Sequence, residues 1–342
     1  MAYKHGVYTS EVATSMVAPI TGTAGLQVIV GTAPVNMLKD PAAAVNVPLL
    51  VNSYKEAVEA VGYLPDFANY TLCECISANF SVVGIAPMVL INVLDPAKHK
   101  VAITGGTVQV NDGVAVLEET GVLLEGLTVK SGSNTLTAGT DYTTTWNNDG
   151  TLNIVVLSTG AGKDATSLTV TGNKIDPSKV TAADIVGGVD SSTGKETGLE
   201  VVRQVYPKLS MTPGILLAPR FSKNAQVCAA LQAKCRKNNG LFNAVCFVDL
   251  DCSADGAQKY TDVAKQKAKQ TATSREAYAL WLYVKVGETV YSGSSMAAAA
   301  TVYNDSQNGD RPVASPSNVT VPISAACLED GTEVLMDQEQ GT

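Results

Sequence analysis

The sequence predicts an α/β fold in which a mainly parallel, helix-flanked sheet domain is interrupted by an inserted all-β domain and preceded by an extended N-terminal arm. Residues 23–97 and 190–318 alternate apolar runs suited to buried strands with segments of helical periodicity, and strands joined by helical crossovers imply a parallel sheet covered on both faces. Residues 98–189 lose the helical period and alternate with a period of two, which is typical of antiparallel strands.

The N-terminal arm is residues 1–22. Val7, Thr9 and Glu11 alternate there with Tyr8 and Ser10, but the segment has too few large apolar side chains to build a core. An extended segment of this kind either stays free in solvent or adds as a strand to the edge of another sheet.

The first α/β block begins with the apolar run Leu26 to Val30. Ser53 and Glu56 fit a capping box whose carboxylate can reach back to the cap, and Gly62 suits the residue after the helix end, so a helix is expected at 54–61. A second helix at 69–79 and a buried strand at 88–94 follow from the spacing of apolar residues.

The second α/β block repeats this alternation. The first expected helix carries Leu199, Val202 and Val205 and ends at Pro207, and a strand follows at 214–218. The next helix is capped by Ser222 and carries Val227, Leu231 and Cys235. The remaining expected elements are a strand at 244–250, a Lys-rich helix at 260–271, a strand at 279–286 and an Ala-rich helix at 295–303.

The insert is rich in Thr, Gly and Val. Alternation is clearest at Val108/Val110, Leu127/Val129, Leu152/Ile154/Val156 and Leu168/Val170. A hairpin is expected from 142–146 and 152–157, because the intervening Asn147-Asn148-Asp149-Gly150 tolerates positive φ. Insertion in a surface connection leaves the host sheet intact, and we expect the insert to project outward as an autonomous domain.

Composition excludes several classes of function. The chain has 342 residues and a formal charge of −8, with only 24 Lys and Arg, which argues against direct nucleic-acid binding. No secretory signal is visible, and the longest apolar stretch, 82–94, is too short to insert in a membrane and is broken by Pro87 and Asn92. We therefore expect the protein to be made in the cytoplasm, with its seven cysteines reduced and buried.

The best candidate for chemistry is the group Asp249, Asp251 and Asp255. These residues lie at and beyond the carboxyl end of an expected parallel strand, where α/β sheets place metals and catalytic acids. Asp is also a common cap after such a strand, and no matching base or phosphate loop accompanies it. We expect a structural role.

Other constellations are incomplete. Gly31 stands alone where a dinucleotide fold needs three glycines, Cys73 and Cys75 lack a second pair for zinc, and Ser294 and Ser295 lack the second glycine of a nucleophile elbow. The only histidines are His5, in the arm, and His99, before the insert. We expect no catalytic residue, no metal and no cofactor. Four lysines, Lys259, Lys265, Lys267 and Lys269, form either a solvated helix face or a contact to an acidic neighbour.

Several longer phrases resemble the contractile tail sheath proteins of phages and tailocins. They are HGVYTSEV, GLQVIVGTAPVN, YTLCE, NVLDPAKHK, ADIVGGVD, TGLEVVRQVYPKL, PGILLAP and RPVASPSN, spread from His5 to Asn318. The resemblance implies a structural subunit, not an enzyme, that stacks around an inner tube and contracts to drive it through a bacterial envelope.

The resemblance also implies partners. Sheath subunits exchange N- and C-terminal arms as strands in neighbouring sheets, so Tyr3, Val7, Tyr8, Thr9 and Val12 become candidate subunit-interaction residues. Further expected partners are the inner tail tube protein, the baseplate and the tail terminator. The expected location is the host bacterial cytoplasm during assembly and then the virion tail sheath.

The sequence departs from the family at its end. The family continues into a further domain where residues 319–342 stop at Thr342, so we expect a truncated C-terminal region and a mainly monomeric fragment. Two alternatives remain: an α/β enzyme with a metal or nucleotide site at Asp249 and Asp251, and a tail-associated adhesin that uses the Thr-rich insert.

Overall fold

A six-stranded sheet forms the centre of the α/β part of the molecule. The computed structural model describes residues 20–21, 25–103, 106–315 and 319–334. The strand order is β19 (Ala277–Leu280), β18 (Val245–Asp249), β17 (Ile215–Leu217), β2 (Gln27–Gly31), β5 (Met88–Asn92) and β3 (Leu49–Val51). All neighbours are parallel except β3, which runs antiparallel to β5. This confirms the α/β class.

Helices cover both faces of this sheet. Side chains alternate along β2, so Ile29 packs on the face that carries α1 (Tyr54–Val61), α2 (Thr71–Ile76) and α7 (Gly293–Gln307). Val28 and Val30 face the layer of α3 (Ala182–Val186), the 3-10 helix Gly198–Gln204 and α5 (Ala225–Lys234). The remaining helices are α4 (Val205–Leu209), α6 (Tyr260–Lys269), the π-helix Ser77–Val83 and the 3-10 turns Val35–Met37, Pro41–Ala44 and Pro177–Lys179.

Smaller sheets complete the α/β part. Strands β21 (Thr289–Tyr291), β20 (Tyr283–Val286) and β22 (Ala325–Cys327) form a three-stranded antiparallel sheet. Two-stranded pairs join β1 (Ile20–Thr21) to β4 (Ile85–Ala86), β15 (Gly188–Val189) to β16 (Glu196–Thr197), and β6 (Lys100–Ala102) to β14 (Asn173–Ile175).

The observed helix starts show which caps could be predicted from neighbouring residues in the sequence. The helix at 54–61 is confirmed, and the Ser53 hydroxyl accepts from the Glu56 amide at 3.2 Å. The Glu56 carboxylate reaches one residue further than expected, to the Asn52 amide at 2.8 Å. The cap of α5 is Asn224, which accepts from the Gln226 amide at 2.9 Å, so the assignment of that cap to Ser222 was wrong.

Two predicted boundaries in the second block are also wrong. The helix expected to stop at Pro207 continues to Leu209, because Pro207 is the third residue of α4 and its missing N–H would have no partner in a first turn. The strand expected at 279–286 is two strands, β19 and β20, which belong to different sheets. The chain leaves the parallel sheet at Leu282, which adopts a φ of 80°.

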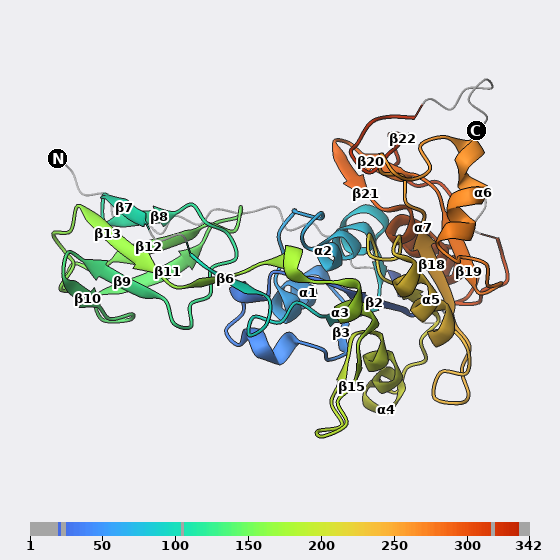
Figure 1. Cartoon of the computed structure of the whole chain (residues 1–342), viewed down its shortest axis with the longest axis horizontal. Coiled ribbons are helices and arrows are strands. Elements are labelled where there is room, and N and C mark those ends of the chain that lie inside the picture. The colour runs from blue at the N-terminus through green and yellow to red at the C-terminus, as the bar shows by residue number, and fades with distance from the viewer. Residues whose placement is uncertain (1–19, 22–24, 104–105, 316–318, 335–342) are drawn as a thin grey trace.

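The insert is a separate antiparallel sheet with its own core. Its strand order is β10 (Asn134–Leu136), β9 (Thr128–Ser131), β13 (Ser167–Thr171), β7 (Gly106–Asn111), β8 (Val114–Leu117), β12 (Leu152–Val156) and β11 (Tyr142–Trp146). The hairpin at 142–157 is confirmed in register, with Trp146 opposite Leu152. The interior carries Leu152, Ile154 and Leu168. Figure 1 shows the insert at one end of an elongated molecule and the α/β part at the other.

The junction between the two parts is packed. Strands β6 and β14 carry the chain into and out of the insert side by side, and the Ile103 amide donates to the Gly172 carbonyl at 2.9 Å. Leu123 and Ile175 belong to the core of the α/β part. A Cβ on Gly150, in the hairpin turn, would lie 2.7 Å from Leu64 Cδ1. Side chains of both parts therefore meet at the junction.

Candidate assembly surface

Asp249 ends β18 as the sequence indicated, but it is enclosed, with 2% of its surface exposed. Its Oδ1 accepts from the Ser294 amide at 2.8 Å and its Oδ2 from the Ser294 hydroxyl at 2.7 Å. The Arg220 amide lies 3.3 Å from Oδ2, and the Ser222 hydroxyl lies 3.4 Å from it. The carboxylate thus holds the N-terminus of α7, where negative charge is favourable.

Burial decides the protonation behaviour of Asp249. Loss of hydration raises the pKa of this carboxyl to about 6, although the hydrogen bonds from Ser294 act in the opposite direction. A raised carboxyl pKa is a feature of many catalytic acids. Here both oxygens are used in hydrogen bonds that position α7, and this supports the structural role expected for Asp249.

A second buried carboxylate, Glu74, was missed by the sequence reasoning. It projects from α2 with no exposed surface. Its Oε2 accepts from Arg220 Nε at 2.7 Å, and its Oε1 accepts from the Ser292 amide at 2.7 Å and the Ser295 hydroxyl at 2.6 Å. The sequence feature that could have revealed Glu74 is its position in the otherwise apolar run Leu72-Cys73-Glu74-Cys75-Ile76. A charge on a buried helix needs a partner.

Arg220 connects the two carboxylates. Burial opposes its charge, but its neighbours, with Glu74 the strongest among them, together outweigh burial and raise the pKa of Arg220. Its guanidinium carbon lies 5.2 Å from the centroid of the Tyr283 ring, within range of a cation–π contact. Arg220 also holds a φ of 63°, which a non-glycine residue adopts only when its surroundings impose it. This cluster ties α2, β18 and α7 together.

The other sequence candidates have local structural roles. Asp251 accepts from the Ser253 amide at 3.1 Å in the turn that also contains the exposed Asp255. A Cβ on Gly31 would lie 2.2 Å from Thr71 Oγ1, so the start of α2 packs directly against this glycine. His99 lies in the packed junction, where its Nδ1 accepts from the Asp95 amide at 3.0 Å.

The cysteines and serines singled out in the sequence are buried. Burial raises the pKa of the Cys73 thiol to about 12 and that of Cys75 well above its ordinary value. All seven cysteines are free thiols, and among the described residues no group of three or more metal-binding side chains is arranged to hold an ion. Ser294 and Ser295 belong to the carboxylate cluster at the start of α7.

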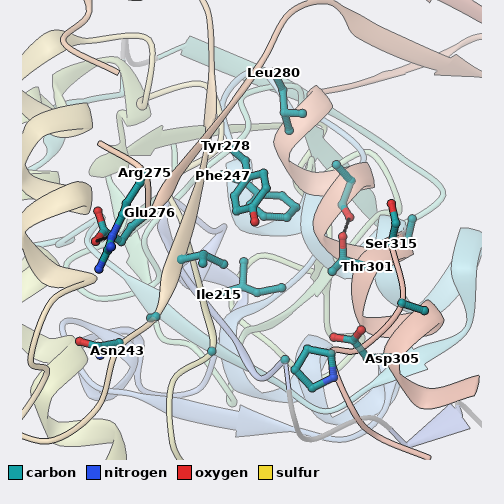
Figure 2. Close-up of a pocket in the computed structure, with 18 of the residues that line it drawn as sticks. Ile215, Asn243, Phe247, Arg275, Glu276, Tyr278, Leu280, Thr301, Asp305 and Ser315 are labelled. Carbon is teal, nitrogen blue, oxygen red and sulfur yellow. Dashed lines mark hydrogen bonds and ion pairs between the residues drawn. The ribbon is translucent and has the colours of Figure 1, made fainter. Parts of the chain in front are cut away.

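An open groove lies between α7 and the part of the central sheet formed by β17, β18 and β19. Its volume is about 1350 Å³. Figure 2 shows Phe247 and Tyr278 from β18 and β19 on one side and Thr301 and Asp305 from α7 on the other. Residues 312–315, Val319 and Val321 form a further wall.

The groove offers apolar surface to a partner. The Phe247 and Tyr278 rings are tilted at 52° with centroids 5.1 Å apart, and 54% of the Tyr278 surface is exposed. Among the residues that the structure describes, β19 is the last strand of the six-stranded sheet on this side and pairs with β18 alone. An unpaired strand edge next to exposed apolar side chains is a surface on which another chain can pack.

The five candidate residues of the arm, Tyr3, Val7, Tyr8, Thr9 and Val12, lie outside the described residues. The lysines Lys259, Lys265, Lys267 and Lys269 lie on an exposed face of α6 and at its start. No helix in the described parts of the chain is long and apolar enough to cross a membrane.

Comparison with known proteins identifies a relative. No protein-family profile matches the chain. The chain is 27% identical over 354 aligned residues to the tail sheath protein of Burkholderia phage BcepMu, a match that covers 99% of this chain and 70% of the relative. This match confirms the resemblance to contractile tail sheath proteins noted in the sequence.

A solved structure is also similar. It is a chain in the cryo-EM structure of the anti-feeding prophage (AFP) baseplate, 6-fold symmetrised, with a TM-score of 0.47 and 12% sequence identity. The similarity covers 99% of this chain and 61% of that chain. The present chain therefore spans about three fifths of that protein's length.

Proposed function

We propose that this protein is a structural subunit of a contractile tail sheath. The observation that carries the proposal is the match to a phage tail sheath protein over 99% of the chain. In such an assembly the subunits would stack around an inner tube, and their collective rearrangement would drive the tube through a bacterial envelope. No bond-breaking step is required of the subunit.

The geometry of the buried carboxylates supports a structural role. Asp249 and Glu74 receive their hydrogen bonds from residues of the chain that position α7 and α2. The groove beside β19 adds an exposed apolar surface at a sheet edge, as expected of a subunit that is covered by neighbours in an assembly.

The partners and location follow from the same proposal. Neighbouring subunits would exchange strands through the arm, and the inner tail tube protein, baseplate and tail terminator would contact the assembled sheath. The insert would face outward. Assembly would take place in the host cytoplasm, and the finished protein would be part of the virion tail.

Electron microscopy tests the proposal. The protein is co-expressed from its complete source gene with the tube protein of the same genome, and sheathed tubes are expected. The double substitution Val7→Pro and Thr9→Pro removes main-chain donors from the arm and should abolish sheathing. The matched control, Val7→Thr with Thr9→Val, keeps these donors and should assemble normally.

The outcomes separate two parts of the proposal. Normal sheaths from the proline variant would show that the arm is not an exchanged strand. Bare tubes from the wild-type protein, with the subunit folded and present in the same lysate, would contradict the sheath assignment itself.

A further inference from the structure

We propose that the exposed face of α6 binds an acidic protein surface. The lysine face is defined here as the exposed part of α6, with Lys265 and Lys269 on one flank and Lys267 on the other, together with Lys259 just before the helix; all four lysines are exposed. Figure 1 shows α6 at the end of the molecule remote from the insert, on the outside of the α/β part. The inference goes beyond the sheath proposal and rests on α6 alone.

Hydrogen bonds fix the rotation of α6 about its axis. Its buried side is polar: Gln266 Nε2 donates to Gln270 Oε1 at 2.7 Å, just beyond the helix end. Gln270 Nε2 donates in turn to the Asp249 carbonyl at 3.0 Å, and Gln270 Oε1 accepts from the Asp251 amide at 2.8 Å. These directional bonds hold the opposite side of the helix, and with it the lysine face, in one orientation.

The lysine face has no acidic partner within the described part of the chain. Ion pairs elsewhere use Lys55, Lys98, Lys174, Lys223, Lys234 and Lys285, but none uses a lysine of α6. Lys265 and Lys269 are four residues apart, where like charges repel. Lys259 occupies the N-cap, where the helix dipole disfavours a cation. Asp262 lies three residues from both Lys259 and Lys265 and offsets part of this repulsion. An acidic partner would relieve the part that remains.

Charge complementarity defines the class of partner. Four lysines and one aspartate give residues 259–269 a charge of +3 in a chain whose total is −8. A polyphosphate such as duplex DNA is attracted by these lysines but is repelled by the net negative charge of the rest of the molecule. A protein surface can present a few carboxylates opposite one helix face alone. We therefore favour an acidic protein surface over nucleic acid.

The surface between the lysines suits close approach. Thr261, Ala264 and Ala268 are exposed on the same helix, and their small side chains leave the longer lysines projecting beyond them. Tyr260, which is 48% exposed at the helix start, offers an aromatic contact, and aromatic residues are enriched in protein interfaces. The lysine charges carry the inference, and these features describe the shape that the partner would meet.

The test is fluorescence anisotropy of a labelled octaglutamate peptide with the whole chain at low ionic strength. The triple variant Lys265→Gln, Lys267→Gln and Lys269→Gln should weaken binding at least about tenfold, since each contact at such a surface contributes modestly. The control variant Lys163→Gln, Lys195→Gln and Lys208→Gln changes the net charge equally at exposed sites elsewhere and should weaken it less than about twofold.

Parallel titrations use duplex DNA and vesicles containing phosphatidylserine. Preference for octaglutamate over both, lost only in the α6 variant, would support the proposal. Equal weakening in the two triple variants, or no binding by the wild-type chain, would overturn it. Tighter binding of DNA or vesicles that depends on the α6 lysines would show that the partner class is wrong. Circular dichroism melting verifies that each variant is folded.

Discussion

Two buried carboxylates show how the same side-chain chemistry can be compensated in different ways. Glu74 is paired with the guanidinium of Arg220, whereas Asp249 accepts hydrogen bonds from amide and hydroxyl groups without a direct ion pair. At Asp249 desolvation is the largest influence, and it raises the pKa of this carboxyl to about 6. The two residues should therefore respond differently to substitution.

The pH dependence of stability should carry the signature of Asp249. Between about pH 4 and pH 6 the folded protein keeps the carboxyl proton that the unfolded chain releases, given an ordinary Asp pKa near 3.9. The stabilisation is full below this window and is lost as pH rises through about 6, by up to about 1.4 kcal/mol per pH unit. Asp249→Asn removes this titration.

Urea unfolding of both proteins at pH 4, 5, 6 and 7 measures the effect. The wild-type free energy of unfolding minus that of Asp249→Asn should fall from pH 4 to pH 6 and level off towards pH 7. Asp184 and Glu276, whose pKa values are lowered to about 2, act on both proteins alike and cancel in the difference. A difference that is constant with pH would show that the pKa of Asp249 is not raised.

Removing the charge of Glu74 should be costly. Glu74→Gln leaves the Arg220 guanidinium buried without its counter-ion, and breaking a buried pair in this way costs about 3–5 kcal/mol. The control, Glu59→Gln, removes an exposed partner of Lys55 and should cost less than about 0.5 kcal/mol. Chemical denaturation compares the two, and similar losses in both variants would rule out the structural role of the pair.

At the level of elements, predictions succeeded where the signal was local. The capping box at Ser53 and the turn Asn147 to Gly150 depend on neighbouring residues, and both elements form where expected. The assignment of 279–286 to one strand failed because both halves have strand patterning. Only the contacts of β19 with β18 and of β20 with β22 separate them.

The candidate sites, too, could be predicted only where neighbouring residues in the sequence define them. Asp249 was found because the end of a parallel strand is a position that sequence can locate. The groove beside β19 could not be found in this way, because its walls come from β18 and β19, from α7, and from residues 312–315, Val319 and Val321. The cluster around Glu74 likewise joins residues more than 140 positions apart.

Gly187 should be essential to the way α3 meets the hairpin of β15 and β16. It adopts a φ of 68°, and a Cβ there would lie 1.8 Å from the Thr197 carbonyl oxygen. Gly187→Ala should lower the free energy of unfolding by more than about 2 kcal/mol, because positive φ and a backbone clash add. Thermal and urea denaturation measure the loss.

The adjacent glycine is the matched control for this substitution. A Cβ on Gly188 would meet nothing within 4 Å. Gly188→Ala should therefore change stability by no more than about 0.5 kcal/mol. Equal effects at the two positions would mean that the close approach of Thr197 to Gly187 does not exist in solution.

For the whole molecule, the relation between the insert and its host is the main question. The insert has its own core, which favours independent folding. The returning chain nevertheless contributes Ile175, Val180 and Ile185 to the core of the α/β part. We therefore propose that the independently folding unit is narrower than residues 98–189 and ends near Gly172.

Two deletions test this proposal. Ile103 and Gly172 are joined by a 2.9 Å hydrogen bond, so a short Gly-Ser linker can replace 104–172 without moving the strands on either side. The α/β part should keep its helical circular dichroism and lose only about 1–3 kcal/mol, because Leu123 leaves the host core.

The longer deletion, 104–186, also removes Val180, Ile185 and the whole of α3. Loss of these buried side chains exposes one face of the host sheet, and α5, which contacts α3, loses its packing partner. This protein should lose cooperative unfolding, as followed by circular dichroism and denaturant titration. If the shorter deletion also lost its helical signal, the two cores would be one cooperative unit. If the longer one still melted cooperatively, α3 would belong to the insert.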